Sequence, residues 1–356
     1  MPAMPHRSLA GLAAVAFLVA WGSSTFLRPI YPTLGALPAR PSAYGHTRHE
    51  HDGHDARIGL PQQALSLGQT LSATCLGPTL LGLWRSEYGV SYGYGSAVAL
   101  SAYLLWRDAT GLAAVHLFCL MLYGVRLNLF LLWRELCIPR FREMRNRIEE
   151  RAVQQGGRLN RLPFIVTCAL LYLGLVAPGV LVFKASVRGA QFGSGFRLAL
   201  LGMYVGWGVA AFGDLYKSVV KAKEGKDAIV TGGPYALLRH PNYTGEQLLW
   251  SANFVAGLLA AATLHPVVRS RHTKHLLQGL HGFHALQSPK AILLTWLPLS
   301  ALGLLGIIFV LMQATAGLEK RQREKYGEEE KYRSWFRKTW PGLALRSPRV
   351  TPESSI

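Results

Sequence analysis

Long apolar runs alternate with shorter polar stretches along the chain. A membrane-spanning helix needs about 20 predominantly apolar residues. Windows that approach this length and composition run over residues 9–27, 64–84, 89–106, 109–133, 163–183, 196–216, 247–264 and 291–313. The pattern predicts an all-α, polytopic transmembrane helical bundle with about 7–8 spans.

The segment before the second window has several interpretations. Arg7 precedes the first apolar run, and no acidic residue appears before Glu50. A signal peptide, a plastid or mitochondrial transit sequence and a true spanning helix all fit this pattern. Residues 28–62, which include Pro29, Pro32, Pro38 and Pro41, predict a mobile connector. We expect a targeting segment or first span plus connector at 1–62, N-terminal spans at 63–108, a membrane domain at 109–343 and a disordered tail at 344–356.

Composition and charge support a membrane location. Half of the residues are hydrophobic, and the 16% that are charged fall below the quarter typical of soluble domains. Lys and Arg outnumber Asp and Glu by 38 to 19, and many of the basic residues lie in 134–161, 217–240 and the tail from Glu319. Positive loops of this kind favour the cytoplasmic face beside anionic lipid, or a phosphate-bearing cofactor, over nucleic acid.

Cysteines and histidines give weaker signals. Cys75, Cys119, Cys137 and Cys168 form no C-x-x-C pair and lie in or beside apolar stretches, so we expect buried thiols. Eight histidines form two tracts, His46, His49, His51 and His54 in the connector, and His272, His275, His281 and His284 in 265–290. We expect no metal at either tract, because nothing orders the first and residues 264–290 contain no carboxylate.

Chemically active side chains gather between the windows 196–216 and 247–264. The segment Phe212-Gly-Asp-Leu-Tyr-Lys217 closes one apolar run, and Thr231-Gly-Gly-Pro-Tyr235 forms a turn that lets backbone approach a ligand closely. Leu238-Arg-His-Pro-Asn-Tyr-Thr-Gly-Glu246 then opens the next run. Ionisable groups at the edge of a membrane helix are costly unless they face a polar cavity, which predicts a functional site. An interfacial aromatic belt does not explain why Asn242 and Glu246 enter the helix.

The run 212–250 resembles the C-terminal domain of the steroid 5α-reductase family. Tyr123-Gly-Val-Arg-Leu-Asn-Leu-Phe-Leu-Leu-Trp-Arg134 is similar to the arginine-bearing helix of that family. Leu318-Glu-Lys-Arg-Gln-Arg-Glu-Lys-Tyr-Gly327 and Lys331-Tyr-Arg-Ser-Trp335 are similar to its closing cytoplasmic helix. The likeness covers 109–343, and the superfamily also contains sterol reductases and isoprenylcysteine and phospholipid methyltransferases. It implies a cytoplasm-facing cofactor cavity and a lipid substrate admitted from the bilayer.

The resemblance leaves two cofactors open, NADPH for the reductases and S-adenosylmethionine for the methyltransferases. NADPH carries a pyrophosphate and a 2′-phosphate, which call for several cations. Methyltransferases of the superfamily often pair two glutamates near the final helix, where this chain has Glu319-Lys320. Glu246 after Asn242-Tyr243 is also the form that reductases have, so the resemblance favours NADPH. The R-H-P triplet and the insertion 265–290 depart from the steroid-processing members, so steroid specificity is not expected.

We therefore expect an NADPH-dependent oxidoreductase that reduces an activated C=C bond of a sterol, enoyl or isoprenoid lipid. A methyltransferase and a non-enzymatic lipid-binding or scaffold protein remain alternatives. The endoplasmic reticulum is the expected location, with a plastid or another organelle membrane as the alternative. The resemblance implies Tyr243 and Glu246 as catalytic candidates. Cofactor-binding candidates are Arg126, Asp214, Lys217, Lys221, Arg239, His240, Asn242, Glu319, Arg323 and Tyr326.

Overall fold

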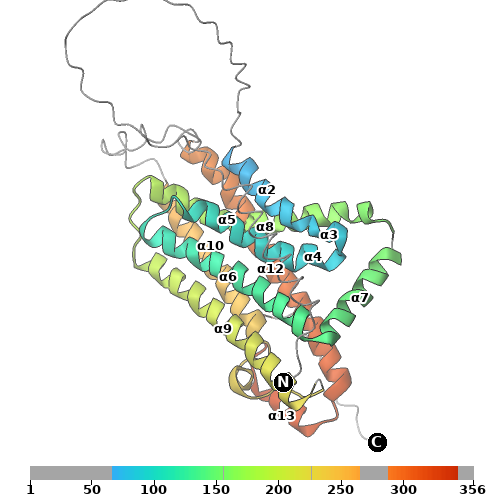
Figure 1. Cartoon of the computed structure of the whole chain (residues 1–356). Helices are drawn as coiled ribbons and strands as arrows, with labels where there is room; N and C mark the ends of the chain where they lie inside the picture. The colour runs from blue at the N-terminus through green and yellow to red at the C-terminus, as the bar shows by residue number, and fades with distance from the viewer. Residues whose placement is uncertain (1–65, 155, 226, 265–287, 344–356) are drawn as a thin grey trace, which may run out of the picture. The chain divides into compact units, whose positions relative to one another are not determined.

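The computed structural model describes residues 66–154, 156–225, 227–264 and 288–343, which belong to a compact unit beginning at Ala64 (Figure 1). These residues form helices and no strand, so the all-α prediction is confirmed. The helices are α2 (Leu67–Thr79), α3 (Leu81–Trp84), α4 (Ser86–Val90), α5 (Tyr92–Trp106), α6 (Gly111–Cys137), α7 (Pro139–Gln154), η1 (Arg158–Arg161), α8 (Leu162–Val187), α9 (Ser194–Glu224), η2 (Gly233–Ala236), α10 (Pro241–Thr263), α12 (Pro289–Tyr326) and α13 (Glu330–Lys338).

Four helices in the described part of the chain are long and apolar enough to cross a membrane. They are α6, α8 together with the preceding turn from Arg158, α9 and α12. The chain is therefore a helical membrane protein. The helices α2 and α5 are shorter, with 13 and 15 residues. The count of seven or eight spans stays a prediction, and the window 9–27 lies outside the described residues.

The helix α8 is central to the bundle. Inside the unit, 72% of its apolar window is buried, against 28–33% for the other three spans. It packs against α2, α5, α10 and α12, while α9 pairs with α10 and α5 pairs with α6 (Figure 1). The outer helices leave leucines such as Leu198 and Leu305 exposed, as expected for surfaces that meet lipid.

Glycines allow two of the helix pairs to approach closely. A Cβ added at Gly303 of α12 would lie 2.3 Å from the carbonyl carbon of Gly174 in α8. A Cβ at Gly206 of α9 would lie 2.6 Å from the carbonyl oxygen of Gly245 in α10. Small residues at such crossings are typical of helix packing in membranes. The second crossing fixes α9 against the motif-bearing start of α10.

Local signals explain where several helices begin. Ser66 and Gln69 form a capping box at α2, and Ser288 caps α12 through the Ala291 amide. Pro241 occupies the first position of α10, where its missing N–H costs nothing. The window 64–84 is divided at Leu80, two residues after Pro78, because a proline inside a helix removes a backbone hydrogen bond.

The thiol prediction holds for three of the four cysteines. Cys75, Cys119 and Cys168 are buried, whereas Cys137 is exposed. The expectation of burial is wrong at Cys137, because it is the last residue of α6, beyond the packed part of the bundle. Most of the insertion 265–290 lies outside the described residues, as do both histidine tracts. No cluster of three or more metal-ligating side chains occurs in the described part of the chain.

Candidate functional site

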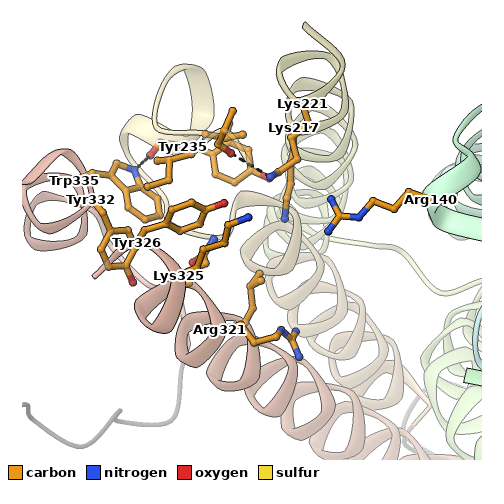
Figure 2. Close-up of a pocket in the computed structure, with 14 residues that line it drawn as sticks. Arg140, Lys217, Lys221, Tyr235, Arg321, Lys325, Tyr326, Tyr332 and Trp335 are labelled. Carbon is orange, nitrogen blue, oxygen red and sulfur yellow. Dashed lines mark hydrogen bonds between the residues drawn. The ribbon is translucent and has the colours of Figure 1, made fainter. Parts of the chain in front are cut away.

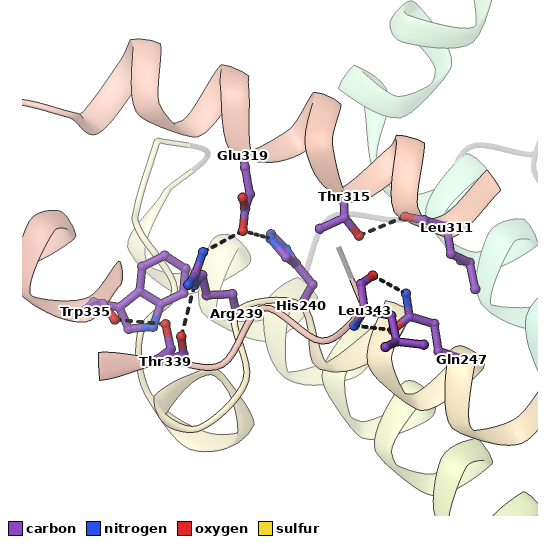
Figure 3. A network of polar contacts seen from close by, with 9 residues as sticks. All are labelled: Arg239, His240, Gln247, Leu311, Thr315, Glu319, Trp335, Thr339 and Leu343. Carbon is purple, nitrogen blue, oxygen red and sulfur yellow. Dashed lines mark hydrogen bonds and ion pairs between the residues drawn. The ribbon is translucent and has the colours of Figure 1, made fainter. Parts of the chain in front are cut away.

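The motif that opens α10 is bound by the C-terminal part of the chain. The Arg239 guanidinium pairs with Glu319, with 2.9 Å between Nη1 and Oε1, and its Nε donates to the Thr339 carbonyl at 3.1 Å (Figure 3). The guanidinium carbon also lies 3.8 Å from the centre of the Phe336 ring. His240 Nε2 is 3.4 Å from the same Glu319 oxygen. Burial lowers the pKa of His240 despite Glu319, which favours the neutral imidazole near neutral pH.

Further contacts extend this binding along residues 335–343, which we call the C-terminal clamp. The Trp335 indole donates to the Tyr235 carbonyl at 2.6 Å. Gln247 forms two hydrogen bonds with the Leu343 backbone, donating to its oxygen at 2.6 Å and accepting from its amide at 3.0 Å (Figure 3). The Arg239 amide donates to the Trp340 carbonyl. The clamp therefore holds the motif against α12 and α13.

A second group of polar side chains lies inside the bundle. Arg126 of α6 pairs with Asp214 of α9 at 2.6 Å and also donates to the Ala210 carbonyl. The half-buried Glu246 lies within electrostatic range of Tyr123, Asp214 and Arg126. Glu246 therefore faces the bundle interior rather than lipid. These contacts give its carboxyl group the polar surroundings that membrane depth requires.

Asn242 and Tyr243 lie between the clamp and this interior group. The Tyr243 ring stacks on His240 with 6.0 Å between ring centres. Its hydroxyl lies within electrostatic range of Glu246 and of Arg321 of α12. Asn242 lies at the close approach of α9 and α10, where its backbone nitrogen would be 2.9 Å from a Cβ added at Gly213. Tyr243 thus lies between the interior group and the clamp.

A cavity of about 280 Å³ opens beside these groups, between α7, α9, α12 and α13 (Figure 2). Its basic lining residues are Arg140, Lys217, Lys221, Arg321 and Lys325, and its aromatic ones are Tyr235, Tyr326, Tyr332 and Trp335. No carboxylate is among the residues that line it. Figure 2 shows the rings gathered on one side, with Arg140 reaching in from a separate helix.

The loop after α9 borders the cavity through a few polar contacts. Asp227 pairs with Lys325, and the Tyr326 hydroxyl donates to the Asp227 carbonyl at 3.0 Å. Lys221 donates to the Ala228 carbonyl at 3.1 Å (Figure 2). Burial raises the pKa of the Tyr235 hydroxyl, so this lining residue is a neutral hydrogen-bonding group. The loop supplies backbone carbonyls, and the helices supply the cations.

The sequence-based candidates fall into three adjoining groups instead of one cavity. Lys217, Lys221 and Tyr326 line the cavity. Arg126, Asp214, Asn242, Tyr243 and Glu246 belong to the interior group or its border. Arg239, His240 and Glu319 interact with one another, and Arg323 lies over the clamp residue Phe336 at 5.8 Å. Their roles in cofactor binding stay predictions.

Six basic or aromatic residues of the cavity were not among the sequence-based candidates. They are Arg140, Tyr235, Arg321, Lys325, Tyr332 and Trp335. The sequence spacing could have indicated Arg321 and Lys325. Together with Leu318 and Gln322 they are spaced at i, i+3, i+4 and i+7, so all four share one face of α12. No comparable spacing points to Arg140, which belongs to a different helix.

The lining chemistry suits an anion that also carries a ring. Arg140, Lys217 and Arg321 form no ion pair within the described residues. Their charge is therefore left for a ligand. Guanidinium groups bind phosphate through paired hydrogen bonds, and aromatic rings stack on planar heterocycles.

The fold and the site thus define an integral membrane helical bundle with a cavity lined by basic and aromatic side chains. A family model described as "Protein of unknown function (DUF1295)" matches residues 91–270. This range is half of the chain, and the chain belongs to that family, which is part of the steroid 5α-reductase and methyltransferase-like superfamily. Neither a curated protein nor a solved structure matches the chain. The matched range includes α9 and α10 but ends before α12 and α13.

Proposed function

We propose that the chain is a membrane-bound, NADPH-dependent oxidoreductase that reduces an activated C=C bond of a lipid. The observation that carries this proposal is the cavity lining, with five cations, four aromatic rings and no carboxylate. NADPH combines a heterocycle with a pyrophosphate and a 2′-phosphate, so both parts of the lining fit it. S-adenosylmethionine is a poorer fit, because its sulfonium cation would lie among like charges.

The positions of the lining residues suggest a different role for each part of the cavity. Arg140, Lys217 and Arg321 would hold the phosphate groups, and the aromatic side would pack against adenine. NADPH bound there would supply a hydride to the β-carbon of an enone or enoyl group, and a proton from solvent would complete the saturated bond at the α-carbon. Tyr243 and Glu246 lie in the first turns of α10, within electrostatic range of each other. We assign to this pair the polarisation of the substrate carbonyl or the orientation of the nicotinamide.

Charge distribution supports the orientation of the site. The loop 134–161 carries eight arginines, and Arg140 of this loop also lines the cavity. Positive loops are retained on the cytoplasmic side. The proposal therefore has the cavity facing the cytoplasm, with about 7–8 spans in the endoplasmic reticulum membrane. The lipid substrate enters from the bilayer.

The test is cofactor identification on the full chain, purified in mild detergent, by thermal shift with NADPH, NADH and S-adenosylmethionine. A ligand that binds only the folded state stabilises it by about 2.7 kcal/mol at a hundredfold excess over its Kd. We expect NADPH to raise the Tm most and NADH less, because the 2′-phosphate adds charge. A shift with S-adenosylmethionine and none with NADPH would establish the methyltransferase instead, and no shift with any of the three would favour a non-enzymatic role.

A matched pair of variants on α12 sharpens this test. Arg321 lines the cavity, and its exposed neighbour Lys320 does not. Arg321→Gln and Lys320→Gln remove the same charge from adjacent positions. We expect Arg321→Gln to weaken NADPH binding by roughly tenfold or more, since hydrogen bonds to charged groups contribute about 1.5–3 kcal/mol. Equal weakening by both variants would mean that only the general positive field of the tail matters.

A further inference from the structure

A second hollow lies away from the basic cavity, where the end of α2 and α3 meet η1. It is a groove of about 510 Å³. Its lining residues are Gly77, Leu80, Leu81, Leu83, Trp84, Arg158 and Leu159. Three of the apolar side chains are well exposed, with 39% of Leu80, 58% of Trp84 and 71% of Leu159 accessible. In a membrane protein, exposed apolar side chains of this kind meet lipid, and a groove among them has room for an acyl chain.

Arg158 is the one charged residue in this lining. It is exposed and forms no hydrogen bond or ion pair within the described residues. The neighbouring arginines are already engaged, since Arg161 pairs with Glu149 at 3.0 Å and Arg85 donates to Asn146 at 3.2 Å. Arg158 therefore has the free charge at the edge of an otherwise apolar groove.

The position of Arg158 along the chain indicates the level of the groove in the bilayer. The candidate span Arg158–Val187 joins the polar turn η1 to the apolar helix α8. Arg158 therefore lies just before the apolar residues begin, and the exposed Phe164 lies among them. An arginine beside a tryptophan is typical of the headgroup level of a membrane. The helix α7 that precedes η1 exposes Arg142, Arg147 and Arg151 against two exposed carboxylates, Glu143 and Glu150, so its surface is positive on balance.

These observations identify the chemistry of the occupant. An apolar groove at this level fits an acyl chain, and the positive edge fits a negatively charged headgroup. A water-soluble peptide would not meet a groove whose apolar side chains face lipid at the edge of the bilayer, and a second copy of the chain would bring the same positive surface against itself. The geometry points to a binding site for one anionic phospholipid, with its phosphate on Arg158 and an acyl chain along Leu80, Leu159 and Trp84.

The site can be tested by native mass spectrometry of the full chain in micelles containing phosphatidylglycerol and phosphatidylcholine with identical acyl chains. We expect the wild type to retain phosphatidylglycerol preferentially. Arg158→Gln should weaken this binding by roughly fivefold, the contribution of one arginine at a membrane surface. Arg151→Gln is the matched control, because Arg151 is exposed on α7 and does not line the groove.

A second variant tests the apolar part of the groove. Leu159→Gln changes a side chain that is 71% accessible, so the fold should be unaffected, and it should weaken retention of both phospholipids. Equal loss in Arg158→Gln and Arg151→Gln would overturn the site, because the attraction would then be diffuse. Equal retention of both lipids by the wild type would also overturn it. A dimer that Leu159→Gln dissociates would show that a second copy occupies the groove instead.

Discussion

The variant Arg239→Gln tests whether Arg239 stabilises the fold through the C-terminal clamp or binds the cofactor. In the structure the Arg239–Glu319 pair is largely buried, with 13% and 4% of the two side chains accessible. Removing one partner of a buried ion pair costs about 3–5 kcal/mol, because the other charge is left without compensation. Glu319 would retain only the weaker contact to His240. The variant also loses the hydrogen bond to Thr339 and the packing against Phe336.

Thermal unfolding in detergent, followed with a thiol-reactive dye, measures this loss. Cys75, Cys119 and Cys168 are buried and free, so they report unfolding. One kcal/mol corresponds to about 2–4 °C for a chain of this size class, so we expect the Tm of Arg239→Gln to fall by on the order of 10 °C. Arg337→Gln is the control, because the Arg337–Glu330 pair is 72% and 74% accessible and should contribute less than about 1 kcal/mol.

The double variant decides whether the two residues act through each other. Arg239→Gln combined with Glu319→Gln should cost clearly less than the sum of the single variants, because the residues share one interaction. Strict additivity would contradict a direct pair. A Tm equal to that of the wild type, together with loss of the NADPH shift in Arg239→Gln, would refute the clamp and restore Arg239 as a phosphate ligand.

Three further predictions concern packing, pH and thiol exposure. Gly303→Ala should lower the Tm sharply because its Cβ would lie 2.3 Å from Gly174, whereas Gly208→Ala, with open space around it, should not; equal melting would contradict the close crossing. Because burial lowers the pKa of folded His240, the unfolded chain binds a proton first, so stability should fall as pH drops below about 6.5. Tm measurements on His240→Asn should show a flatter profile, and an unchanged slope would count against this assignment. A polar maleimide should add one label to the folded chain, at Cys137, as measured by mass; labelling of a second cysteine would contradict the burial of the others.

Apolar length alone was enough to locate most of the described helices, but it did not reveal how they pack. The spans containing α8 and α12 have mean hydropathies of 2.3 and 2.2, yet 72% of the first window and 28% of the second are buried. A helix facing lipid and a helix facing other helices are both apolar, so hydropathy does not separate them. The small residues Gly174 and Gly303 mark the contact between these two helices, and they become informative only once the partners are known.

The sequence also could not show which basic residues share the cavity, for a similar reason. The end of α12 is polar on all sides, so no apolar stripe shows which basic face meets a ligand. Arg323 faces the clamp, and Arg321 and Lys325 face the cavity. Arg140 depends on a tertiary anchor, since its helix α7 is held by the buried Arg145, which pairs with Glu135. The sequence indicated the positive charge and the motif, whereas helix packing determines which cations share a space.

The C-terminal clamp has a consequence for the order of synthesis. The Arg239–Thr339 contact joins residues that are 100 positions apart. At about 5–20 residues per second, roughly 5–20 s pass between synthesis of the two. During that interval the start of α10 already exists, while Glu319 and the rings of α13 are still missing. Translation that stops before Glu319 would leave a membrane-inserted bundle in which Arg239 and His240 lack Glu319 and Gln247 lacks Leu343, a form that quality-control proteases would recognise.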